Sequence, residues 1–187
     1  GGNGILEIIE RQLNTSVEWL FGYDVLSNHR VLIDWPAQIV TFGAPLPRGQ
    51  VTTSIPLRLT MGVPSIQATF HGRRIDAILD SGAALSYAPP YTVQRLEPAG
   101  SYTDFYPGLG EFEVETGKSE VRVGERTFPV RVGVLPPLLM MTLGLLLGDD
   151  GWILGTDFFR DRKILLDYSR HRLLDIAPQL EWPGMIE

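Results

Sequence analysis

The chain has 187 residues, of which 44% are hydrophobic and 20% charged, so it can bury the core of one ordinary domain. The sequence has no cysteine, which excludes disulfides, thiolate metal sites and a cysteine nucleophile. Its three histidines lie far apart, and we expect no metal or other cofactor. The net charge of −6 argues against a nucleic-acid partner, and 20 glycines with 14 prolines favour a β-rich fold.

The first segment, residues 4–43, opens with a helix-like stretch. It closes with "RVLIDWPAQIVTF", residues 30–42, which predicts two strands joined by a turn at Asp34. Residues 52–135 then hold several strand-like runs, with hairpin-like breaks at Gly72 and Gly124.

A long apolar run follows, from Val132 to Leu147, interrupted only by glycine, proline and threonine. We predict a strand that ends at Pro136 and Pro137, and then a buried helix. The run is shorter than the ~20 residues that span a bilayer, so no membrane span is expected in this chain.

An internal repeat links the two ends of the chain. Residues 4–43 align without a gap on residues 137–176, at an offset of 133 residues. The helix-like and strand-like patterns match throughout, and we interpret the repeat as real. Seven aligned pairs are identical: Leu6 and Leu139, Leu13 and Leu146, Trp19 and Trp152, Gly22 and Gly155, Asp24 and Asp157, Leu32 and Leu165, Asp34 and Asp167.

The segment "AILDSGAAL", residues 77–85, carries the chemistry. A strand-like run enters a tight turn at Asp80, where Ser81 can bond backbone donors and Gly82 permits a close backbone path. By itself an Asp-Ser-Gly turn is common, and Asp80 could simply satisfy local N–H groups.

The order of segments suggests more than a turn. An apolar strand, Asp-Ser-Gly-Ala, a β-rich span and then "GWILGTDFF", residues 151–159, resembles the retropepsin-like and pepsin-like aspartic proteases. The resemblance implies that Asp80 is one catalytic carboxylate, that Ser81 and Gly82 support the active-site loop, and that the apolar-Gly turn crosses behind that loop. It also implies hydrolysis of a peptide bond by a water molecule held between two carboxylates.

The resemblance further implies a fold class and a division of the chain. We expect a mainly β protein: an acid-protease-like β-barrel lobe with short helices, preceded by the closing half of a second, similar lobe. Residues 1–46 would form the partial lobe, with one helix and strands, and residues 47–187 the complete lobe.

A flap over the cleft is also implied, and "DFYPGLGEFEVETG", residues 104–117, is the best candidate. Glycines would let it move and aromatic residues would contact an extended peptide. An ordinary hairpin with core aromatics is the alternative. The candidate flap residues are Phe105, Tyr106, Gly108, Gly110 and Phe112.

The sequence carries a single Asp-Ser-Gly, whereas the family needs two loops. The chain could be a piece of a two-lobed protease whose first loop lies upstream, which the repeat favours. It could be a homodimer that supplies Asp80 twice, or a non-catalytic relative that binds peptides or assembles. An unrelated β-barrel with a chance turn motif is the remaining possibility.

Overall fold

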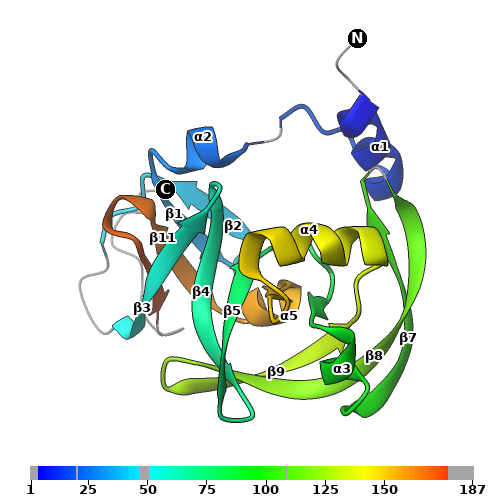
Figure 1. The fold of residues 1–187 in the computed structure, drawn as a ribbon. Helices are drawn as coiled ribbons and strands as arrows, with labels where there is room; N and C mark the ends of the chain where they lie inside the picture. The colour runs from blue at the N-terminus through cyan, green and yellow to red at the C-terminus, as the bar shows by residue number, and fades with distance from the viewer. Residues whose placement is uncertain (1–3, 20, 47–50, 108, 177–187) are drawn as a thin grey trace.

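The protein is described by a computed structural model that covers residues 4–19, 21–46, 51–107 and 109–176 (Figure 1). It is mainly β, with a few short helices, as the sequence predicts. The helices are α1 (Gly4–Leu13), α2 (Tyr23–Leu26), α3 (Pro90–Val93), α4 (Pro137–Leu147) and α5 (Thr156–Phe159), with a 3-10 turn at Tyr168–Arg170. The strands are β1 (Arg30–Asp34), β2 (Ile39–Phe42), β3 (Val51–Thr60), β4 (Val63–Phe70), β5 (Arg73–Leu79), β6 (Ser86–Tyr87), β7 (Glu97–Tyr106), β8 (Gly110–Val123), β9 (Arg126–Gly133), β10 (Trp152–Leu154), β11 (Lys163–Asp167) and β12 (Arg172–Ile176).

The strands form one continuous sheet in the order β2-β1-β11-β12-β3-β4-β5-β10-β6-β9-β8-β7. An additional pairing joins β4 to β8, with Thr69 opposite Arg122. This contact closes β4, β5, β10, β6, β9 and β8 into a ring, which leaves β3, β12, β11, β1 and β2 as an arm on one side (Figure 1). The result is a small barrel with a sheet extension on one side, and β7 pairs with β8 outside the ring.

The predicted hairpins are confirmed. Gly72 lies between β4 and β5 and Gly124 between β8 and β9, both with positive φ, which glycine adopts at little cost. The turn at Asp34 joins β1 to β2 as expected, because its Oδ1 accepts a hydrogen bond from the Ala37 N–H at 3.2 Å.

The apolar run after β9 differs from the expectation in two ways. The strand ends at Gly133, before the prolines, and the helix α4 is not buried. Of its side chains only Leu143 is fully buried, while Leu138, Met141 and Leu145 are exposed. A helix that is apolar on every side gives no pattern from which its buried face can be read. No helix in the described part of the chain has the length and hydrophobicity to cross a bilayer.

Both copies of the repeat contribute a strand hairpin to the arm. Strand β1 pairs antiparallel with β11, with Leu32 opposite Leu165, and each strand also pairs with the second strand of its own hairpin. Lys163 forms an ion pair with Asp34 across this junction, at 2.8 Å. The division into a partial lobe and a complete lobe stays a prediction.

Candidate active site

Strands β5 and β6 frame the loop that carries Asp80. Between them lies β10, which runs parallel to β5 with Leu154 opposite Leu79 and antiparallel to β6 with Ile153 opposite Tyr87. The loop of residues 80–85 therefore turns at the end of β10, where backbone groups from two distant parts of the chain meet.

Residues just after β10 hold this loop in place. The Asp80 N–H donates to the Leu154 carbonyl at 3.0 Å, and the Thr156 N–H donates to the Ala83 carbonyl at 2.9 Å. The Thr156 hydroxyl also donates to the Ala84 carbonyl at 2.9 Å. Because its backbone groups are paired with a neighbouring element, the loop has a defined course.

Gly155 permits this close approach. A Cβ atom added there would lie 2.1 Å from the Leu85 carbonyl oxygen, which no side chain could tolerate. The apolar-Gly turn of "WILG" therefore passes directly behind the loop and leads into α5, the arrangement that the resemblance implied.

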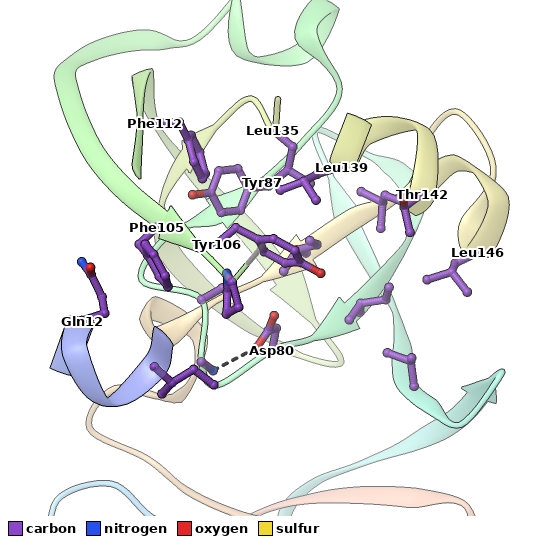
Figure 2. A pocket seen from close by; sticks show the side chains of 18 residues that line it. Gln12, Asp80, Tyr87, Phe105, Tyr106, Phe112, Leu135, Leu139, Thr142 and Leu146 are labelled. Carbon is purple, nitrogen blue, oxygen red and sulfur yellow. Dashed lines mark hydrogen bonds between the residues drawn. The ribbon is translucent and has the colours of Figure 1, made fainter. Parts of the chain in front are cut away.

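The Asp80 side chain is exposed at this turn. Its Oδ1 accepts a hydrogen bond from the Gly82 N–H at 2.9 Å (Figure 2). Ser81 is also exposed. This bond alone would suit a simple Asx turn, so the catalytic role of Asp80 and the supporting roles of Ser81 and Gly82 stay predictions.

Asp80 lines a cleft of about 590 Å³. Among the described residues it is the one carboxylate in the lining, and most of the others are apolar. Figure 2 shows its side chain among residues of the β7–β8 hairpin, of β6 and of α4. Such a pocket, apolar with a single convergent acid, is the usual setting of a binding or catalytic site.

The candidate flap is the hairpin formed by β7 and β8. Phe105, Tyr106 and Phe112 line the same cleft as Asp80, so the structure brings these predicted residues together. Gly110 begins β8 opposite Tyr106, with φ of 89°. Gly108 lies outside the described residues. Closure of this hairpin over a substrate stays a prediction.

A hydrogen bond from Tyr87 to Asp104 ties β7 of the β7–β8 hairpin to β6. The buried Tyr87 hydroxyl, on β6, donates to the Asp104 carboxylate, on β7. Burial, and then this bond to a carboxylate, raise the pKa of Tyr87 far above its usual range. Sequence reasoning missed this pair because β9 and β8 separate β6 from β7 in the sheet, so no strand-pairing pattern relates the two residues.

Sequence reasoning also missed the two helices at the sides of the cleft. Helix α4 contributes Leu139, Thr142, Leu143 and Leu146, and α1 contributes Ile9 and Gln12. Figure 1 shows α1 beside the tip of the β7–β8 hairpin, far in sequence from the rest of the site. Thr142 follows Ile9 by the repeat offset, so equivalent positions of the two copies face one cleft.

A metal centre finds no support here. Among the described residues, no three histidine, aspartate or glutamate side chains gather closely enough to hold an ion.

Comparisons with known proteins give structural likeness but no sequence family. No family model matches the chain, and no curated protein matches it. The solution structure of the simian foamy virus (mac) protease is 19% identical with a TM-score of 0.36, covering 49% of this chain and 86% of that one.

Two further solved structures show the same kind of likeness. A retropepsin-like aspartic protease from Rickettsia conorii is 19% identical, with a TM-score of 0.44, covering 66% of this chain and 89% of that one. The retroviral protease-like domain of Ddi1 from Leishmania major is 15% identical, with a TM-score of 0.34, covering 63% and 96%. The chain is therefore similar to retropepsin-like aspartic proteases, and scores of this size assign it no activity.

Proposed function

We propose that this chain is one part of an aspartic endopeptidase and that Asp80 is one of its two catalytic carboxylates. The observation that carries the proposal is the position of Asp80: an exposed carboxylate on a loop held by residues 154–156, in a cleft lined by apolar side chains. An extended peptide would bind along this cleft beneath the β7–β8 hairpin.

The chemistry requires a second carboxylate close to Asp80. Two carboxylates at short range do not ionise together easily, so they share one proton. The ionised member takes a proton from a bound water, whose oxygen attacks the peptide carbonyl carbon. The protonated member gives its proton to the carbonyl oxygen. The intermediate then breaks its C–N bond: the amine nitrogen takes the proton that the first carboxylate received from water, and a hydroxyl of the intermediate returns its proton to the second carboxylate.

The second carboxylate has to come from beyond the described residues of one chain. A second lobe or a homodimer partner would supply it. The substrate is a peptide or protein, and the apolar lining favours hydrophobic side chains in that substrate.

A second candidate function is peptide binding or assembly without cleavage. It is favoured by the same cleft, since Asp80 is the one carboxylate among its described lining residues. A single carboxylate cannot act as both the base and the acid of this mechanism.

The test compares the chain with Asp80→Asn on a quenched peptide library, from acid to neutral pH. Oligomeric state is measured on the same samples. Asp76→Asn is a matched control, because Asp76 lies four residues before Asp80 and forms a surface ion pair with Arg58 at 3.1 Å. We expect Asp80→Asn to lower kcat/KM by about 10²–10⁴-fold or more and Asp76→Asn to leave it unchanged.

Cleavage that survives Asp80→Asn would contradict the proposal. Tight binding of library peptides in the cleft without cleavage at any pH would favour the binding module.

A further inference from the structure

The two copies of the repeat fold to the same plan over much of their length. Helix α2 and helix α5, β1 and β11, and the starts of α1 and α4 are all separated by 133 residues. Gln38 and His171 occupy the same offset, and both have positive φ, at 59° and 49°. The repeat is therefore present in the backbone as well as in the sequence.

The copies are also related by symmetry. In the β1–β11 pair Leu32 lies opposite Leu165, its own counterpart in the repeat. Arg30 lies opposite Asp167, and their counterparts Lys163 and Asp34 also lie opposite each other. Such a register arises when a two-fold axis passes through the central pair. The rotation that carries residues 137–176 onto residues 4–43 therefore also predicts what should surround the first copy.

The surroundings differ most around Trp19. Its counterpart Trp152 begins β10 and is 2% exposed, whereas Trp19 is 74% exposed. Leu154 is fully buried, and its counterpart Phe21 is 50% exposed. Strand β10 lies between β5 and β6, but residues 17–19, 21 and 22 have no strand neighbour in the described part of the chain (Figure 1).

Strand β2 shows the same difference. Its counterpart β12 pairs with β3 along its outer edge, and Leu173 there is fully buried. The outer edge of β2 has no strand partner among the described residues, and Val40, the counterpart of Leu173, is 54% exposed. The exposed Phe42 ring packs edge-on against Phe21 at 5.7 Å, so one apolar patch joins both regions.

Gly22 supplies an independent observation. Its φ and ψ are −91° and −174°, close to the −88° and −158° of Gly155. Any residue can adopt this extended backbone, and the nearest atom to a Cβ added at Gly22 belongs to the Asp24 side chain. At Gly155 the glycine is required because the Asp80 loop lies against it. A glycine would be required at position 22 for the same reason if a similar loop packed against it.

A second copy of this chain does not fit this patch. Its own slot between β5 and β6 is filled by its own β10. The β11–β12 hairpin of a second copy also could not pair with β11 as β1 does, because β1 already occupies that edge of β11.

We infer that Trp19, Phe21, Gly22, Val40 and Phe42 form a docking face for a β-lobe with the strand plan of residues 51–135. We call this surface the closing face. The partner lobe lacks its own closing segment, and residues 17–43 supply it. Residues 19–21 enter between two strands of the partner lobe. A further strand of that lobe pairs with the outer edge of β2. The inference deepens the proposed function by naming the partner, and rests on it only for the partner's carboxylate.

The test adds such a lobe to the complete chain. Residues 51–135 are duplicated and joined ahead of residue 1 by a flexible Gly/Ser linker, and amide hydrogen exchange is followed by mass spectrometry. We expect exchange at residues 19–22 and 39–42 to slow by at least about a hundredfold relative to the parent chain. Either copy of the duplicated lobe could occupy the face, with the same result.

Two variants of the fusion control for non-specific effects. Gly22→Val should abolish the added protection, because its side chain would meet the partner loop as one at Gly155 would meet Leu85. Gly4→Val should not, since nothing lies within 4 Å of a Cβ added there. An added lobe that leaves residues 19–22 exchanging at the parent rate overturns the inference. A parent chain that dimerises and protects these residues by itself also overturns it.

Cleavage of the peptide library by the same fusion separates the two proposals. Protection without cleavage supports the docking face and counts against the protease. Cleavage without protection supports the protease and overturns the docking face.

Discussion

Residues 137–176 and residues 4–43 follow one plan, yet among the described residues only the first set has every strand paired on both sides. Where the surroundings are shared, the copies agree closely: Asp34 accepts a bond from the Ala37 N–H, and Asp167 accepts the equivalent bond from the Arg170 N–H, both at 3.2 Å. Where they differ, the structures differ. Residues 152–154 form a strand between β5 and β6, and Trp19 and Phe21, the counterparts of Trp152 and Leu154, are not in a strand.

This comparison shows how little local sequence decides here. Trp-x-hydrophobic-Gly occurs in both copies, and only the copy with strand partners forms a strand. Strand preference is mostly a preference for packing and pairing, so the same pattern has two outcomes. Substitutions at equivalent positions should therefore have unequal effects in the isolated chain.

The largest difference is expected between Gly155→Val and Gly22→Val. At position 155 the new side chain would collide with the Leu85 backbone, forcing the Asp80 loop away. We expect Gly155→Val to lower the free energy of unfolding by about 4 kcal/mol or more and Gly22→Val by less than about 1 kcal/mol. Urea unfolding monitored by circular dichroism measures both. Equal losses would show that the two glycines have equal surroundings.

Next in size is the pair Trp152→Ala and Trp19→Ala. Trp152 is buried in the core and contacts Phe70 at 4.8 Å between ring centres, so its loss should cost about 3–5 kcal/mol. Trp19→Ala should stay within about 0.5 kcal/mol, because the side chain is exposed. The same unfolding assay applies. A large loss at Trp19 would mean that the isolated chain already covers it.

The third prediction concerns acid stability. Asp167 is fully buried, and burial acts to raise its pKa. Bonds from the Ser169 hydroxyl and from the Arg170 backbone and guanidinium outweigh burial and hold the pKa below its usual value. A lowered pKa in the folded state means stability that is present above the unfolded value, about 3.9, and is lost as the pH falls through the folded pKa.

Asp167→Asn should therefore destabilise the protein at pH 7 by about 1–3 kcal/mol, and the difference from the parent should shrink below about pH 4. Unfolding free energies from pH 2 to 7 test this. Asp149→Asn, at an exposed position, is the control and should change stability by less than about 0.5 kcal/mol. A difference in unfolding free energy that does not change with pH would show that the charge of Asp167 is not the cause.

The smallest effect is expected at Tyr87, which lines the slot for β10 and also binds the flap strand. Tyr87→Phe removes the bond to Asp104 and should cost about 1–2 kcal/mol of stability. If the β7–β8 hairpin is a flap, the variant should also raise KM more than it lowers kcat, because the hairpin would close over substrate less often. A loss of stability with unchanged kcat and KM would show that the Tyr87–Asp104 bond has only a structural role.

Much of the barrel could be predicted from residue patterns. Alternating strands and hairpin glycines marked β4, β5, β8 and β9, and the repeat marked β1, β2, β11 and β12. These signals are local or depend on comparing two segments, so they survive without knowledge of the fold. The expected burial of α4 was wrong because an all-apolar helix does not indicate which side faces the core.

The candidate site was less accessible from sequence. Asp80 and the hairpin aromatics Phe105, Tyr106 and Phe112 were singled out by motif and by composition, and they line one cleft. Ile9 of α1 was not, because its place in the cleft depends on the pairing of β1 with β11, more than a hundred residues away. Contacts of that kind are decided by topology, and no local pattern encodes them.

The β1–β11 junction also has a consequence for how the chain folds. Strand β1 is made before its partner β11, which follows it by more than a hundred residues. Pairings between such distant segments form slowly, since a long loop must close first. Until β11 is available, β1 has an unpaired edge that can pair with other chains and promote aggregation. Folding of this protein should therefore depend on protection of its amino-terminal hairpin from aggregation while the barrel forms.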